Sequence, residues 1–231
     1  MKKGIIFLVA SILLLALTAC SPAEGPQLPE DAKHFSAEQQ KVLLTSYELW
    51  IGGEKTSLGI KAADFPPVFP EVFRNIAFDK TDPKQRAIGK YLKAQTETLY
   101  YEAYLSPQKD YYHPYTESEI MSFYMVGGMP GHMEAWGVTF DMTQEEAEAA
   151  MAAYFDIEKN FPGTALPILD DRSYLIAELT DAEKDCAGID SDSVVSMPSY
   201  RMHSNRLDLL IVDGKVRGMS LIAGMNLLAI A

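Results

Sequence analysis

Three side chains in the middle of the chain could carry acid–base or metal chemistry together. His132 and Glu134 are separated by one residue, so on a β-strand both point to the same face, and His113 lies upstream. Imidazole and carboxylate groups act as general acids and bases and as ligands of metals such as zinc. The chain has only four histidines, none in a recognised metal-ligand spacing. We therefore expect no bound metal or other cofactor, and a hydrolase built on these three residues is our alternative hypothesis.

A second group of candidate residues is aromatic. Residues 100–124 hold seven of the twelve tyrosines. Tyrosine is common at packing surfaces, and it is also a residue of choice for interface hot spots and for contacts with sugar rings. Tyr111, Tyr112 and Tyr115 fall in a proline-containing loop, where burial is harder than on a helix or strand. We interpret these three, with Trp136, as candidate ligand contacts; packing in the core is the alternative.

Cys186 is the remaining candidate nucleophile. It lies in KDCAG at an expected helix end, and no local signature of a cysteine hydrolase surrounds it. We therefore predict a half-buried, unreactive thiol. The sequence also lacks HExxH, GxSxG, a phosphate-binding loop and paired CxxC motifs.

Capped helices are expected to position many of these residues. Four segments begin with the Ser/Thr-x-x-Glu/Gln pattern of a capping box, at Ser36, Thr116, Thr143 and Thr180. The first predicts a helix that runs to Gly52-Gly53, and the third predicts a helix to about Lys159. Asp82-Pro83 predicts a further long helix that ends before Pro107 and contains several of the tyrosines.

The last quarter of the chain is expected to form a sheet. Residues 207–212 and 215–223 predict two strands joined by a tight turn at Asp213-Gly214. Residues 136–140 are a further strand candidate, and residues 173–179 fit a strand or a helix. No charge follows Arg217, so we expect the C-terminal residues to be buried. We predict one globular domain over 34–231 with an α+β fold, in which N-terminal helices pack on a C-terminal, mainly antiparallel sheet.

The N-terminus indicates where the protein is located. Lys2 and Lys3 precede a short apolar run that ends in Leu17-Thr18-Ala19-Cys20. A helix of thirteen residues rises only about 20 Å, which is too short to span the hydrocarbon core of a membrane. The last four residues resemble the lipobox of bacterial lipoproteins. The resemblance implies a signal peptide over 1–19, acylation of Cys20, and a protein tethered through a proline-containing segment, 20–33, to a bacterial membrane.

The net charge of the chain limits the kinds of partner that it can bind. Removal of residues 1–19 takes away two lysines, so the formal charge changes from −12 to −14. Such an acidic protein repels phosphate backbones, which disfavours nucleic acid. We therefore predict a lipid-anchored, non-enzymatic envelope protein that binds a protein or glycan partner; inhibition of a basic enzyme is one variant. The alternative is a small envelope hydrolase that uses His113, His132 and Glu134.

Overall fold

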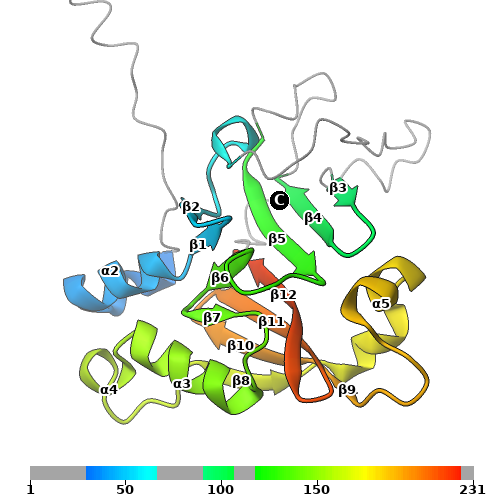
Figure 1. Cartoon of the computed structure of the whole chain (residues 1–231). Coiled ribbons are helices and arrows are strands. Elements are labelled where there is room, and N and C mark those ends of the chain that lie inside the picture. The colour runs from blue at the N-terminus through cyan, green and yellow to red at the C-terminus, as the bar shows by residue number, and fades with distance from the viewer. Residues whose placement is uncertain (1–29, 67–90, 107–117, 225–231) are drawn as a thin grey trace, which may run out of the picture.

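The protein has an α+β fold, as the sequence predicted (Figure 1). The structure, a computed structural model, describes residues 30–66, 91–106 and 118–224. The helical elements are η1 (Glu30–His34), α2 (Ala37–Thr45), η2 (Ala62–Asp64), α3 (Gln144–Tyr154), α4 (Ile157–Asn160), η5 (Ser173–Glu178) and α5 (Asp181–Ala187), where η marks a 3-10 helix. The strands are β1 (Glu48–Ile51), β2 (Glu54–Ser57), β3 (Tyr91–Gln95), β4 (Tyr100–Leu105), β5 (Ile120–Val126), β6 (Met133–Ala135), β7 (Val138–Thr139), β8 (Ile168–Asp171), β9 (Val195–Ser196), β10 (Pro198–Met202), β11 (Asn205–Val212) and β12 (Lys215–Ile222).

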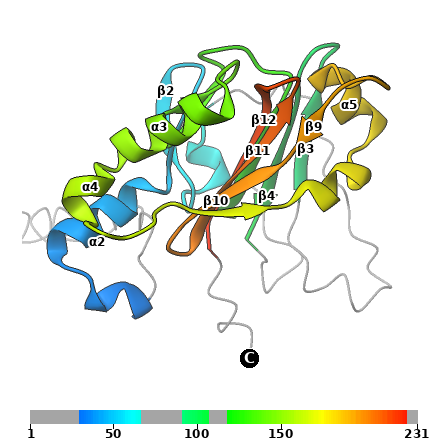
Figure 2. The same cartoon turned by 90° about the horizontal axis from the view of Figure 1, so that it is seen from below.

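The strands form two antiparallel sheets. The small sheet has the order β2-β1-β6-β7, and the large sheet has the order β3-β4-β5-β12-β11-β10-β8, with β9 paired to β11. The helices α2, α3 and α4 lie with the small sheet on one side of the large sheet, whereas η5 and α5 lie on the other (Figure 2). The large sheet is thus covered on both faces, and its interior strand β11 is buried along nearly its whole length.

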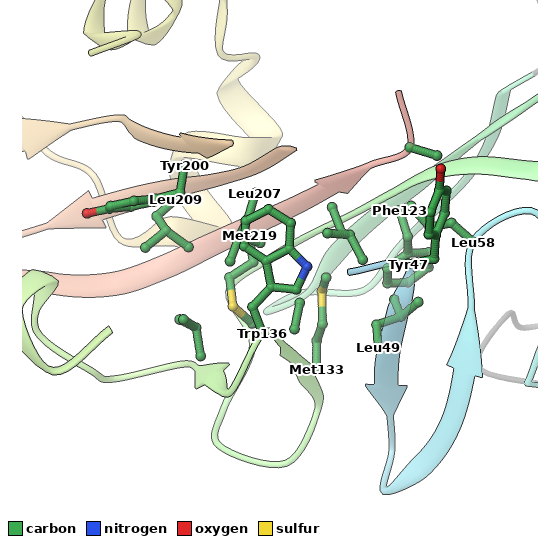
Figure 3. Close-up of a cluster of buried hydrophobic side chains, with 14 of the residues drawn as sticks. Tyr47, Leu49, Leu58, Phe123, Met133, Trp136, Tyr200, Leu207, Leu209 and Met219 are labelled. Carbon is green, nitrogen blue, oxygen red and sulfur yellow. The ribbon is translucent and has the colours of Figure 1, made fainter. Parts of the chain in front are cut away.

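The main hydrophobic core lies between the two sheets. Trp136, Met133 and Leu49 of the small-sheet region meet Phe123 and Met219 of the large sheet (Figure 3). Each of these side chains is almost completely buried. Burial of a large apolar side chain contributes about 2–3 kcal/mol, so this contact is the main force that holds the sheets together. A second, smaller cluster fills the space under α5 on the opposite face.

The first helix is shorter than the sequence predicted. Its capping box is present, with Ser36 Oγ accepting from Gln39 N at 3.2 Å, but α2 ends at Thr45. Residues 48–51 form strand β1, because their side chains alternate between the core and the half-buried face and their backbone pairs with β6. Gly52 and Gly53 both have positive φ, and they make the turn to β2 rather than end a helix.

The prediction of a long helix that ends before Pro107 is wrong. Residues 91–105 form the hairpin of β3 and β4, and residues 82–90 lie outside the described part of the chain. The burial of β4 mostly alternates, which is typical of a strand with an interior position in a sheet. The helix expected from Thr116 is also wrong: Thr116 itself lies outside the described residues, but residues 120–126 form β5.

The other two capping boxes begin helices as predicted. Thr143 accepts from Glu146 N at 3.2 Å and its own backbone N donates to Glu146 Oε2 at 2.7 Å, which begins α3. The expected helix to Lys159 is interrupted, since Asp156 has a φ of 46° and separates α3 from α4. The box formed by Thr180 and Glu183 begins α5, which ends at Gly188.

The C-terminal hairpin is confirmed. β11 and β12 pair around Asp213-Gly214, where both residues have positive φ, as a tight two-residue turn requires. Residues 136–140 are not one strand: Trp136 and Gly137 make a positive-φ turn between β6 and β7. Residues 173–178 form the 3-10 helix η5. The expected burial of the C-terminus holds to Ala223, and residues 225–231 lie outside the description.

The folded domain begins earlier than the predicted residue 34. Glu30–His34 form η1, and Ala32 is 1% exposed because it packs into the main core. The signal peptide, Cys20 and most of the predicted tether lie outside the described residues. Within the described ranges, no helix is both long enough and apolar enough to cross a membrane.

Candidate functional site

A row of polar side chains crosses the face of the large sheet that carries η5 and α5. Strand register places Asp208 of β11 opposite Ser220 of β12, Ser220 opposite Tyr124 of β5, and Tyr124 opposite Glu102 of β4. Residues directly opposite each other in a sheet share one face, so these four side chains lie in line. Ser199 of β10 extends the row, since it pairs with Asp208.

The polar row forms the floor of a cleft of about 290 Å³. This volume is near the lower end of the range of ligand pockets, about 300–1,000 Å³. We call it the acidic cleft, and its lining residues are Glu102, Ser122, Tyr124, Leu175, Glu178, Leu179, Glu183, Met197, Asp208, Leu210 and Ser220. Four of these eleven described residues are acidic and none is basic, and strand register places Lys93 of β3 opposite Glu102. The apolar lining residues are Leu175 of η5, Leu179 directly after η5, Met197, and Leu210 of β11.

The carboxylates at the two ends of the cleft differ in their partners. Asp208 is neutralised: Arg206 Nε lies 2.9 Å from its Oδ1, and Ser199 Oγ donates to the same oxygen at 2.6 Å. At the other end, Glu102 Oε2 accepts a hydrogen bond from Tyr100 Oη at 2.8 Å. Glu183 approaches this end from α5, where its carboxylate also caps the helix through Thr180. Glu102 and Glu183 thus both lie where β4 and α5 face each other.

The two tyrosines between these carboxylates are held in the neutral form. Burial raises the pKa of Tyr100, and the hydrogen bond to Glu102 raises it further. Burial also raises the pKa of Tyr124, and the nearby charge of Glu183 adds to this effect. The Tyr124 hydroxyl is buried, and the Glu183 carboxylate lies close enough to act on it as a hydrogen-bond acceptor.

Trp136 is not part of a surface site. Its side chain is fully buried between the sheets, and its Nε1 donates to the backbone oxygen of Ser46 at 2.8 Å. A fully buried indole cannot contact a ligand at the surface of the folded domain. The alternative that the sequence left open, packing in the core, describes Trp136, and we do not retain it as a ligand contact.

The aromatic-loop residues Tyr111, Tyr112 and Tyr115 lie outside the described residues, as does His113. The structure therefore does not test the loop. His132 precedes β6 and Glu134 lies within it; both are half-buried, on either side of the buried Met133, so they share the outward face. The backbone N of Met129 donates to His132 Nδ1 at 3.3 Å. The part of the chain that the structure describes contains no group of three or more residues able to hold a metal.

Cys186 lies near the end of α5, as predicted, and is a free, half-buried thiol. Burial raises the pKa of its thiol, and the charges of Asp185 and Glu183 add to the rise. A raised pKa keeps the sulfur protonated near neutral pH and lowers its reactivity.

The residues of the acidic cleft were missed at the sequence level. The sequence pattern predicts a helix at Glu102, and it predicts a strand at Asp208 without indicating a site there. The available signal is a single acidic residue inside a mostly apolar strand, in YYEAYL and in NRLDLLIV. A carboxylate in such a place needs a partner or a function, because burial of an unpaired charge is costly. Comparison of the chain with protein-family models, curated proteins and solved structures gave no match.

Proposed function

We propose that this chain is an envelope lipoprotein whose globular domain binds a partner without catalysis. Acyl chains on Cys20 anchor it, the segment before residue 30 is the tether, and the acidic cleft is the binding site. The lipobox Leu17-Thr18-Ala19-Cys20 supports the anchor. Two or more acyl chains are needed for stable residence in a membrane, which acylation of an N-terminal cysteine supplies.

The observation that carries the binding proposal is the acidic cleft. It combines aliphatic lining residues with a row of polar side chains, a composition typical of sites that orient a ligand through a few polar groups. The partner is a protein or a glycan of the envelope, and inhibition of a basic enzyme remains one form of the proposal.

A partner-capture assay that compares the parent chain with a variant whose cleft is filled by a larger side chain tests this function. The protein used is the mature chain, residues 20–231, with Cys20→Ser, which changes only the acylation site. It is immobilised and exposed to envelope extract of the producing bacterium. Ser220→Phe places an aromatic ring in the cleft and blocks a ligand of any charge. Ser191→Phe makes the same change on an exposed loop and is the control.

We expect one defined protein or glycan to be retained by the parent chain and by Ser191→Phe, and to be lost by at least about ten-fold with Ser220→Phe, a change of about 1.4 kcal/mol. Thermal unfolding confirms that each variant is folded. Equal retention by both variants, or no retained molecule at all, contradicts the proposal. A third variant with alanine at Tyr111, Tyr112 and Tyr115 tests the aromatic loop in the same assay.

A further inference from the structure

The seven residues that follow Gly224 form an uncharged and mainly apolar segment. They read Met-Asn-Leu-Leu-Ala-Ile-Ala, residues 225–231, and lie outside the described part of the chain. Asn226 has the only polar side chain among them. Removal of apolar side chains from water is favourable, and an exposed segment of this composition promotes aggregation. Such a segment gains stability when it packs on an apolar surface within its reach.

The last described residues lie beside the connection between β2 and η2. Met121 O accepts a hydrogen bond from Ala223 N at 2.8 Å, and the neighbouring Ile120 O accepts one from Gly59 N at 2.8 Å. Two bonds of this length to adjacent residues of β5 place Ala223 within about 10 Å of Gly59. Seven extended residues span up to about 23–25 Å. Residues 225–231 can therefore reach the surface around β2.

A cavity of about 460 Å³ lies at this place. We call it the β2 cavity, and its lining residues are Leu44 of α2, Glu48 of β1, Lys55, Thr56 and Ser57 of β2, Ile60, and Asp64 of η2. Leu44 and Ile60 are half-buried, whereas Lys55 is exposed and forms an ion pair with Glu48 at 2.8 Å. A cavity of about 150 Å³ with apolar walls holds a molecule of benzene, so the β2 cavity can hold two or three apolar side chains.

The β2 cavity borders the free edge of the small sheet. β2 is the end strand of this sheet among the described strands. Leu58 N donates to Tyr47 O, and backbone bonds alternate from there, so the N–H and C=O groups of Lys55 and Ser57 point away from β1. Lys55 and Ser57 also line the cavity. An extended segment can therefore pair with β2 while its side chains fill the cavity.

Two other apolar surfaces fit residues 225–231 less well. The acidic cleft lies under η5 and α5, on the other side of the large sheet from α2 and the small sheet (Figure 2). Its four carboxylates would gain no partner from an uncharged segment. The edge strand β8 exposes Ile168 and Leu169, but three strand spacings of about 4.8 Å separate it from β12. Much of the segment would be used to cross that distance.

We propose that residues 225–231 of the same chain occupy the β2 cavity as an extended strand antiparallel to β2, with Leu228 and Ile230 against Leu44 and Ile60. The direction follows because the segment starts near the residues that follow β2 and runs back along that strand. Leu228 and Ile230 are two residues apart, so they share one face of a strand. The small sheet then gains a fifth strand, and its edge no longer offers free backbone groups to other chains. This inference is independent of the binding function of the acidic cleft.

Hydrogen exchange of two backbone amides tests the docking. In the mature Cys20→Ser chain, we expect the amides of Lys55 and Ser57 to exchange at least about ten-fold more slowly than in the same chain shortened to end at Gly224, because the deletion removes their acceptors. The amide of Leu169 is the control: it points away from β10 on the edge strand β8 and should exchange equally in both chains. Unchanged exchange of Lys55 and Ser57 overturns the proposal.

Substitutions at two positions of the segment test whether its apolar side chains hold it in place. Leu228→Asp with Ile230→Asp places charges at the proposed contact, whereas Leu228→Met with Ile230→Val keeps both positions apolar. We expect the aspartate pair to speed exchange of Lys55 and Ser57 by at least about ten-fold, and the apolar pair by less than about three-fold. Equal effects of the two pairs contradict the proposal, and thermal unfolding shows that each variant is folded.

Sedimentation distinguishes docking in the same chain from docking on a second copy. We expect the mature chain and the chain that ends at Gly224 to have the same oligomeric state, and the slow exchange of Lys55 and Ser57 to persist over about a hundred-fold dilution. A dimer that forms only when residues 225–231 are present would place the segment in the cavity of a second copy. That result, or slow exchange that is lost on dilution, overturns the proposal.

Discussion

Asn205 Nδ2 donates to Ser46 Oγ at 2.6 Å, and this bond joins the end of α2 to the start of β11 across 159 positions of sequence. Both side chains are buried. Asn205 Oδ1 also accepts a hydrogen bond from Gly224 N at 2.9 Å. The backbone oxygen of Ser46 accepts a hydrogen bond from Trp136 Nε1. One small polar cluster thus connects α2, the β6–β7 turn and both ends of the C-terminal hairpin inside an otherwise apolar core.

The Asn205 amide is expected to be important for stability. Asn205→Ala leaves Gly224 N without its side-chain acceptor and removes the donor to Ser46, so we expect the free energy of unfolding to fall by about 2–3 kcal/mol. Urea denaturation of the mature Cys20→Ser chain measures this change. Gln144→Ala, at an exposed hydrogen bond near the start of α3, serves as the control and should change stability by less than about 0.5 kcal/mol. A loss of the same size in both variants would contradict the importance of the cluster.

Trp136 is expected to serve stability rather than binding. Trp136→Phe removes the donor to the Ser46 oxygen and leaves space between the sheets, and a loss of about 2–3 kcal/mol should follow. Partner capture by the variant that remains folded should be unchanged. A Trp136→Phe variant that is as stable as the parent chain but no longer captures the partner would show that Trp136 contacts the partner and that its assignment to the core is wrong.

The capping box of α3 gives a prediction about local stability. Thr143→Ala removes the acceptor for Glu146 N, and we expect a loss of about 1 kcal/mol. Thr143→Ser keeps the oxygen and should retain most of the stability. Hydrogen exchange of the first amides of α3 measures the effect directly. Equal exchange in the alanine and serine variants would mean that packing, rather than the cap, fixes the start of this helix.

Buried phenols determine the alkaline limit of stability. Burial raises the pKa values of Tyr100, Tyr124, Tyr154 and Tyr200 above the ordinary value of about 10. The folded state therefore holds protons that the unfolded state loses, so this contribution is complete below pH about 10 and falls as the pH rises further. We expect the phenolate absorbance of these residues to appear together with unfolding. Full ionisation of all tyrosines near pH 10 in a chain that is still folded would contradict this.

The fold class and the C-terminal hairpin could be predicted because their signals are local. Asp213-Gly214 has the backbone chemistry of a tight turn, and Thr143 and Thr180 each supply both halves of a capping box within four residues. Residues 91–105 could not be assigned in the same way. Their spacing also fits a helix, and only the pairing of β4 with β5, a strand that comes later in the chain, settles them as strands. Gly52-Gly53 is a second case in which the local pattern fits two structures, because the glycines of a hairpin turn resemble those that end a helix.

The candidate site was harder to predict than the fold, for a physical reason. Glu102, Tyr124, Asp208 and Glu183 come from four separate elements, and sheet register together with the position of α5 brings them together. Spacing along the chain carries no information about that register. What the sequence does offer is an isolated carboxylate in each of two apolar strands, a pattern that indicates where to look but not what lies opposite.

Acylation of Cys20 is the most direct test of the central claim, that this is a membrane-anchored protein with its binding domain outside the cytoplasm. Producing cells are grown with labelled palmitate, and the full chain is compared with Cys20→Ser. We predict a labelled protein that begins at Cys20 and sediments with membranes, and an unlabelled Cys20→Ser chain. An unlabelled wild-type chain, or one that remains full-length in the cytosol, would contradict the account.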